Sequence, residues 1–218
     1  MALHAAWAKL DADLNLLGLN LRNFAATKPL ASASDFSLLD ECLLEGLLSR
    51  VWQAWGSFCR TCVMESCMGT TDAAGAAIAA IPYAASEEHV SGAAIRAKSG
   101  KAPLWGSTNA ILRLEPTWGD VDVLSRIINR LQPTNSGKML AAFSSAYQCA
   151  KALQSVRNGA AHNHTQNLGD ILKLRSAYVV FPIAHPTQAM FWIEPQSQDF
   201  LVTHAIEELR DSGLAAVS

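Results

Sequence analysis

The sequence is poor in charged and aromatic residues and has no long apolar run. Charged side chains make up 17% of the 218 residues and aromatic ones 7%, whereas half of the chain is hydrophobic. That composition is enough for a packed core and argues against global disorder. The most apolar run, residues 73–81, has about half the length that a membrane-spanning helix needs. We therefore expect a globular protein without a membrane segment.

The chain also lacks an excess of charge of either sign, because its formal net charge is −2. A protein that grips nucleic acid over a wide footprint is usually more basic. If this chain binds nucleic acid, we expect it to do so through a local site or cleft, or through one built between subunits.

The five cysteines are odd in number and show no regular spacing. This pattern favours reduced thiols and a cytoplasmic location. The first residues lack a basic stretch followed by an apolar core, so no signal peptide is expected. Cys59, Cys62 and Cys67 fall inside one helical pattern without the paired spacing of a structural zinc site. We expect them to be small core residues.

Several catalytic motifs are missing. The sequence contains no Walker-type glycine-rich loop and no Gly-x-Ser-x-Gly elbow, which argues against a P-loop nucleotide hydrolase and a Ser-His-Asp hydrolase. His162 and His164 would be metal ligands if Asp170 or His185 joined them, but one histidine pair is weak evidence for such a site. We therefore expect neither a metal nor a cofactor.

Apolar periodicity predicts a mostly α-helical bundle formed by a single domain over residues 1–218. Residues 177–195 are expected to form a short C-terminal β-hairpin, with strands over 178–183 and 189–193. The chain from residue 211 onward is expected to be a loose tail. Helices are expected over residues 3–24, 38–68, 86–98, 121–131, 136–159, 165–176 and 199–210.

The helix predicted over residues 136–159 carries the most informative residue, Arg157. At about 100° per residue, a narrow apolar stripe runs along this helix, and Arg157 is the next residue on the same line. Such an arginine fits a cation near a helix C-terminus, a partner of a buried carboxylate, or a ligand for an anion. The facing helix belongs either to the same chain or to a second copy. The stripe consists of Met139, Phe143, Ala146, Ala150 and Leu153.

The residues that follow Arg157 favour a phosphate ligand. Asn158 is polar, and His162 and His164 come within the next few residues. Histidine is able to take a proton from a ribose 2′-hydroxyl or give one to the leaving 5′-oxygen. Arginine stabilises the charge that develops on the phosphorus oxygens. This pair suits cleavage of an RNA backbone, in which the 2′-hydroxyl is the nucleophile and no metal is required.

The run from Arg157 to His162 at the end of a helix resembles the signature of the HEPN superfamily. That signature is an arginine, four to six residues and a histidine, often with a polar residue directly after the arginine. Here four residues separate Arg157 from His162, and Asn158 occupies the polar position. The resemblance is best over about residues 36–176 and implies a compact all-α bundle.

Membership of this superfamily would imply a metal-independent endoribonuclease that acts as a homodimer, with its active site where two domains meet. Arg157 would bind the scissile phosphate, Asn158 would orient Arg157 or contact RNA, and His162 would transfer the proton. The products would carry a 2′,3′-cyclic phosphate. A toxin or antiviral defence role, with an antitoxin or regulatory partner protein, is also implied. The alternative is a non-catalytic module of the same fold that binds RNA, a nucleotide or a partner protein.

A second histidine also fits the signature. On a continued helix His164 would lie nearly under Arg157, whereas His162 would be rotated by about 140°. Helical geometry therefore favours His164, while the asparagine after Arg157 favours His162 by resemblance. Gly159 is the residue expected to distort the turn and reconcile the two. We predict His162 as the catalytic residue, with His164 as an auxiliary or a substitute.

Overall fold

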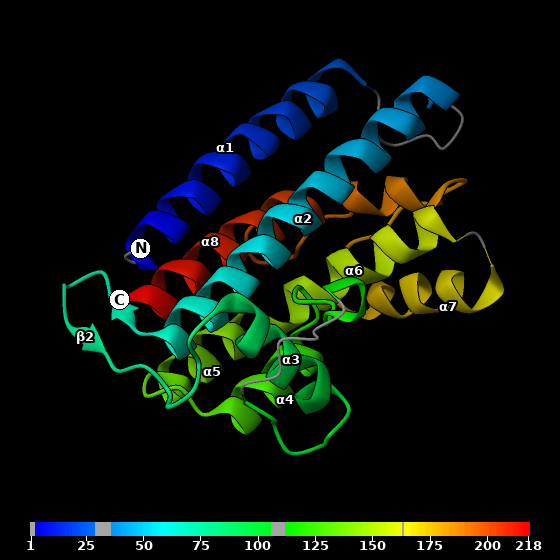
Figure 1. Ribbon diagram of the computed structural model, residues 1–218. Helices are drawn as coiled ribbons and strands as arrows, with labels where there is room; N and C mark the ends of the chain where they lie inside the picture. Colours follow the sequence, from blue (N-terminus) through cyan, green and yellow to red (C-terminus); the bar gives the residue numbers. More distant parts are fainter. Residues whose placement is uncertain (1–2, 29–35, 106–111, 163) are drawn as a thin grey trace. The chain divides into compact units, whose positions relative to one another are not determined.

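The computed structural model describes residues 3–28, 36–105, 112–162 and 164–218. In these ranges the chain is mostly α-helical with a short antiparallel hairpin (Figure 1), which confirms the predicted fold class. None of the helices described there is both long enough and apolar enough to span a bilayer.

The chain forms two compact units, each assembled from separate stretches of sequence. Long helices at both ends of the chain contribute residues to both units, so each unit is discontinuous. The prediction of one domain over residues 1–218 stays a prediction. The first unit contains Met1–Asp11, Trp55–Tyr147 and Arg210–Ser218, and the second contains Ala12–Ala54 and Gln148–Leu209.

Most helices begin and end within a few residues of the bounds that the sequence periodicity predicted. Local signals explain this agreement. For example, Asp120 caps the helix that follows it, because its side chain accepts hydrogen bonds from the backbone N–H groups of Asp122 and Val123. The α-helices are α1 (Leu3–Thr27), α2 (Leu38–Met68), α3 (Glu87–Lys98), α4 (Val121–Leu131), α5 (Ser136–Ser145), α6 (Tyr147–Ala161), α7 (Thr165–Lys173) and α8 (Leu201–Val217).

The core of the first unit is built around aromatic rings of α2 and α5. Trp55 and Phe58 lie 5.9 Å apart between ring centroids, and each meets Phe143 edge to face. Trp55 is fully buried, and its indole N–H donates to the carbonyl oxygen of Gly119 at 3.2 Å. This bond satisfies the one polar group that burial of the ring would otherwise leave without a partner.

A hydrogen-bonded carboxylate holds the loop before α4 in the first unit. Glu115 accepts two hydrogen bonds from the guanidinium of Arg60, at 2.8 and 3.0 Å, and further ones from Ser91 and Trp118. Burial alone would raise the pKa of this carboxyl, but the donors around it lower the pKa to about 2. The charged form of Glu115 is therefore the one that the fold stabilises.

The core of the second unit also contains an aromatic cluster. Phe24 of α1 stacks on Phe191 at 5.7 Å, Phe36 contacts both rings, and Phe200 meets Phe191 edge to face. Phe191 ends the 3-10 helix η4 (Pro186–Phe191). The cluster thus ties α1 to the segment that follows α7, which is the part of the chain around the candidate site.

The hairpin lies elsewhere than predicted. Strands β1 (Thr70–Thr71) and β2 (Ala77–Ile78) pair in antiparallel register, with Gly75 at a positive φ of 83° in the connection. Within the predicted hairpin at residues 177–195, pairing is limited to a single bridge from Val179 to Ile193, and η4 replaces most of the second strand. The prediction for 177–195 was wrong because His185 caps a helical turn there rather than a strand turn.

The helix predicted over residues 136–159 is broken at Ala146, between α5 and α6. In an unbroken helix the carbonyl oxygen of Ala142 would accept from the N–H of Ala146. Instead it accepts from the hydroxyls of Ser145 at 2.7 Å and Ser212 at 2.8 Å, and the N–H of Ala146 donates to the backbone carbonyl of Ser144. Serine hydroxyls compete with the helical backbone in this way. The single long helix was therefore a wrong prediction.

The chain after residue 210 was also wrongly predicted as a loose tail, because α8 continues to Val217. Ser212 and Val217 are buried. A side chain at Gly213 would meet Leu10 at 2.9 Å, so the absence of a Cβ at this position lets α8 approach α1 closely. Packing against a distant part of the chain thus orders a segment that carries no strong local signal.

We expect the stabilising effect of Glu115 to depend on pH. The pKa of this carboxyl is lower in the folded state, so its contribution is fully present above the ordinary value of about 4.5 and is lost as the pH falls toward 2. Glu115→Gln should lower the free energy of unfolding at pH 7 by about 2 kcal/mol. Urea unfolding measured between pH 7 and pH 3 should show the two proteins converging. A constant difference would contradict this explanation.

Candidate functional site at the turn between α6 and α7

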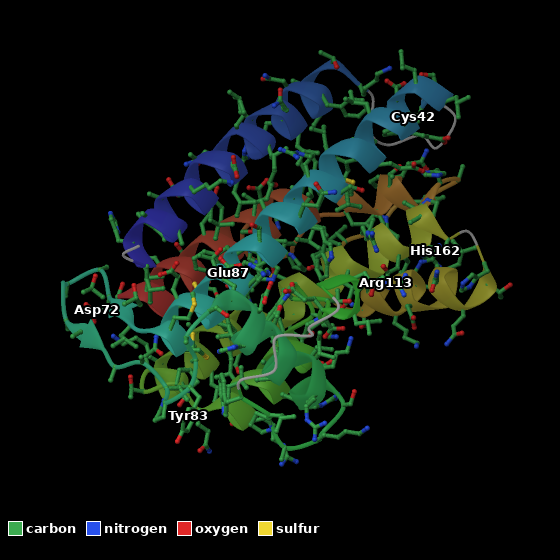
Figure 2. The ribbon with its side chains drawn as sticks, in the orientation of Figure 1. Cys42, Asp72, Tyr83, Glu87, Arg113 and His162 are labelled. Atoms are coloured by element: carbon green, nitrogen blue, oxygen red, sulfur yellow. The ribbon has the colours of Figure 1, made fainter. Side chains whose placement is uncertain are left out.

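The candidate residues lie at the C-terminal end of α6 and in the turn that leads to α7. Arg157 and Asn158 belong to the helix and are half-buried, whereas His162 directly follows the last helical residue and is exposed. Figure 2 shows His162 where the ribbon of α6 gives way to the turn. The structure therefore places Arg157, Asn158 and His162 at one end of one helix.

Arg157 is oriented by its neighbour in the sequence. Its Nη1 donates to Oδ1 of Asn158 at 3.1 Å. Among the residues that the structure describes, Arg157 forms no ion pair with a carboxylate, and the last turn of α6 contains no basic residue. The buried-carboxylate alternative is therefore not seen there, whereas Arg157 does lie near the C-terminus of α6, four residues before Ala161. Since a guanidinium has five N–H donors, one bond to Asn158 leaves it able to bind an anion.

Arg157 does not complete the apolar stripe, because it is half-buried and lies beside the buried face of α6 rather than on it. All five residues of the stripe are buried, but the buried face of α6 continues through Val156 and Gly159. Arg157 lies at the edge of that face. A small cavity of about 40 Å³ adjoins it, lined by Glu45, Leu48 and Ser49 of α2 and by Arg157, Ala160 and Ala161 of α6. The facing helix is thus α2 of the same chain.

The turn is held by Asn167, a residue that the sequence pattern did not single out. Its side-chain Nδ2 donates to the backbone carbonyl of Asn158 at 3.1 Å and to that of His162 at 2.9 Å. The carbonyl of Asn158 also accepts from the N–H of His162 at 2.9 Å, so the amide of Asn167 adds a second bond there and joins the end of α6 to the start of α7. The sequence feature that could have identified Asn167 is an amide side chain in the first turn of the next predicted helix.

Gly159 allows α7 to lie close to α6. A Cβ at this position would be 2.4 Å from Cδ1 of Ile171 and 3.4 Å from Pro186. Gly159 remains inside α6, which continues to Ala161, so it does not distort the turn as predicted. The absence of a side chain at Gly159 leaves room for Ile171, which is fully buried, to pack on the helix.

The two histidines lie on opposite sides of the turn. The N–H of His162 still donates to the carbonyl of Asn158 at 2.9 Å, as in a helix, whereas His164 is the N-cap residue of α7. Helical geometry favoured His164 only for a continued helix, and this assumption was wrong because α6 ends at Ala161. Nε2 of His164 lies 3.5 Å from Nδ2 of Asn167, so this imidazole is next to the amide that holds the turn.

A polar groove runs along the other face of the α6 end. Its volume is about 260 Å³. Asn158 lines this groove, and its Oδ1 also accepts the hydrogen bond from Arg157. It therefore connects the groove to the guanidinium. The groove is lined by Lys151, Gln154, Ser155 and Asn158 of α6 and by Asn167 and Asp170 of α7.

Neither the histidines nor the cysteines form a metal site within the described part of the chain, where no three His, Cys, Asp or Glu side chains are grouped suitably. Asp170 pairs with Lys173 at 2.7 Å, and His185 with Glu45 at 3.4 Å. Cys59, Cys62 and Cys67 of α2 are fully buried, as expected for core residues. Burial raises the pKa of the Cys67 thiol to about 12.

The close approach at Gly159 leads to a test with a built-in rescue. Gly159→Ala should lower the free energy of unfolding by about 1–3 kcal/mol, because the new methyl group overlaps Ile171. Adding Ile171→Val removes the overlapping Cδ1 atom and should recover part of that loss. The measurement is urea unfolding of the single and double variants.

Gly169→Ala is the matched control, because Gly169 lies on α7 and no atom comes within 4 Å of the place that a new methyl carbon would take. It should be neutral or stabilising by up to about 1 kcal/mol, as for alanine in an open helical position. Equal effects of the two glycine substitutions would contradict the close packing of α7 on α6.

Comparison of the chain with protein-family models, curated proteins and solved structures found no match. The resemblance to the HEPN superfamily therefore rests on the run from Arg157 to His162 at the end of a helix and on the mostly helical fold.

Proposed function

We propose that this chain is a metal-independent endoribonuclease of the HEPN type. The observation that carries the proposal is the end of α6, where a guanidinium without a carboxylate partner in the described structure is oriented by Asn158 and followed by the exposed imidazole of His162. A half-buried guanidinium followed closely by an exposed imidazole suits phosphodiester chemistry.

The proposed reaction is a transesterification within the RNA strand. The ribose 2′-oxygen attacks the neighbouring phosphorus, a new P–O2′ bond forms, and the P–O5′ bond breaks. The 2′-hydroxyl loses its proton to a base, and the leaving 5′-oxygen receives one. The products are a 2′,3′-cyclic phosphate and a 5′-hydroxyl.

Each residue has a separate role in this proposal. Arg157 binds the scissile phosphate and stabilises the charge that develops on its oxygens. Asn158 keeps the guanidinium in place through the 3.1 Å hydrogen bond. His162 transfers the proton, since its exposed side chain is accessible to a substrate. His164 is the auxiliary residue, next to the amide of Asn167.

The proposal includes a homodimer that completes the site. The 40 Å³ cavity beside Arg157 is far smaller than the roughly 300–1,000 Å³ of ordinary ligand pockets, so one chain does not enclose a nucleotide there. On α2, which lines this cavity, Leu39 and Leu43 are exposed by 78% and 49%. They are four residues apart and share a helix face, which suits contact with a second copy.

The biological setting follows from the resemblance alone. It comprises a toxin or antiviral defence role in the cytoplasm, with RNA as the substrate and an antitoxin or regulatory protein as a partner. The second candidate function is a non-catalytic module of the same fold. The small volume of the cavity at Arg157 favours this candidate, because a binding surface needs no enclosed reaction site.

Substitution of the proposed catalytic residues should abolish cleavage of labelled RNA in the presence of EDTA. We expect Arg157→Ala and His162→Ala each to slow cleavage by about 10²–10⁴-fold, because each removes charge stabilisation or proton transfer. His164→Ala should reduce the rate less than His162→Ala. Gel analysis of a time course measures all three rates.

The matched controls are Arg130→Ala and His4→Ala, since both residues are exposed and lie on other helices. They should cleave like the wild type. If the wild-type protein binds RNA but does not cut it, the non-catalytic module is the better explanation. If Arg130→Ala lost as much cleavage activity as Arg157→Ala, general positive charge rather than Arg157 would be responsible for cleavage.

The proposed dimer is tested by placing negative charges on the exposed face of α2. Leu39→Glu combined with Leu43→Glu should weaken self-association at least about 10-fold, because two carboxylates would be buried in an apolar contact. Sedimentation equilibrium measures the association constant. Leu16→Glu combined with Leu19→Glu is the control, since both are similarly exposed but lie on α1. A wild-type monomer would overturn the dimer proposal.

A further inference from the structure

The polar groove between α6 and α7 has the construction of a recognition site. Its four residues from α6 follow the spacing i, i+3, i+4 and i+7 and therefore share one face of that helix. Two residues of α7, Asn167 and Asp170, form the opposite wall. All six lining residues are polar, which differs from the mostly apolar lining of ordinary small-molecule pockets.

The lining of the groove has no excess of positive charge, as a second phosphate site would need. Lys151 supplies one positive charge and Asp170 one negative charge, and the remaining lining groups are neutral amides and a hydroxyl. The ammonium of Lys151 also donates to Oε1 of Gln154 at 3.2 Å. Asp170 also pairs with Lys173, which lies outside the lining, at 2.7 Å. The lining itself therefore holds one charge of each sign, and a neutral ligand with both donors and acceptors meets complementary groups.

Two amides in the groove have orientations that are fixed by their other partners. Oδ1 of Asn158 accepts from Arg157, so its NH₂ group is the one to offer a ligand. Nδ2 of Asn167 donates to two backbone carbonyls, so its oxygen is the acceptor on offer. The groove therefore presents a fixed donor beside a fixed acceptor.

A nucleobase edge is the complement of such a pair. Amide side chains recognise bases by donating to a ring nitrogen and accepting from an exocyclic amino group, and carboxylates also accept from such amino groups. Asp170 adds a second acceptor to the wall. The set of acceptors therefore favours adenine, cytosine or guanine over uracil, which has no amino group.

We infer that the groove between α6 and α7 is a base-binding subsite that holds one amino-bearing nucleobase of an RNA strand bound at Arg157. This rests on the proposed function for the choice of RNA as the ligand. The volume of the groove, about 260 Å³, lies just below the roughly 300–1,000 Å³ of ordinary ligand pockets, so the occupant is limited to a single base. Asn158 couples base and phosphate recognition, because it belongs to the groove and bonds Arg157.

The test uses two 2′-O-methyl octamers, which lack the nucleophilic hydroxyl and so are not cleaved. One contains eight uridines, and the other has a single adenosine at its centre. Fluorescence anisotropy with the full-length protein should give about 5- to 50-fold tighter binding of the adenosine octamer, in line with one specific side chain–base contact. Asp170→Asn and Gln154→Ala should each reduce this ratio to below about 2-fold while binding of the uridine octamer stays unchanged.

Glu88→Gln is the control, since Glu88 is an exposed carboxylate of α3, and it should keep the full ratio. If the wild type binds both octamers equally, the base subsite is overturned while RNA binding at Arg157 survives. If it prefers adenosine but both groove variants keep the preference, the location of the subsite is overturned. If neither octamer binds, the RNA-based proposal fails together with the subsite.

Discussion

The close approach of α7 to the end of α6 is the constraint on which the candidate site depends. It requires the absence of a side chain at Gly159, where Ile171 packs. The amide of Asn167 then joins the two helices, because it donates to the backbone carbonyls of Asn158 at 3.1 Å and of His162 at 2.9 Å. With both contacts in place, the chain turns directly after Ala161, and His162 and His164 are held on the two sides of the turn.

The same helix end presents two different chemical environments. Arg157 adjoins a small cavity against α2, and Asn158 faces the polar groove against α7. The hydrogen bond between their side chains couples the two faces. An amide whose oxygen is held by a guanidinium keeps a fixed orientation, so a ligand in the groove meets a donor that is already in place. This arrangement links recognition of a base to recognition of a phosphate in the proposed function.

Much of the fold could be predicted because its signals are local. The N-cap Asp120 and the apolar periodicity of α2 place helix boundaries within a few residues of those observed. The break at Ala146 could not be predicted, because the hydroxyl of Ser212 contributes to it from a distant part of the chain. The order of the last residues likewise depends on a remote contact, between Gly213 and Leu10.

The candidate site divides in the same way. The positions of Arg157, Asn158 and His162 at a helix end follow from the sequence pattern, but the close approach of α7 to α6 depends on contacts between the two helices. Asn167 lies beyond the signature, and its role emerges only when both helices are present. The sequence argument from helical register favoured His164 because it assumed that the helix continues past residue 161, where α6 ends.

The central claim is that the end of α6 directs attack by the ribose 2′-oxygen, and the chemistry of the product ends tests it most directly. A short RNA is incubated with the protein in EDTA, and the fragments are analysed by mass spectrometry, with Arg157→Ala as the blank. We predict fragments that end in a 2′,3′-cyclic phosphate and begin with a 5′-hydroxyl, and none in the blank. Intact RNA, or fragments with 3′-hydroxyl and 5′-phosphate ends, would contradict the claim.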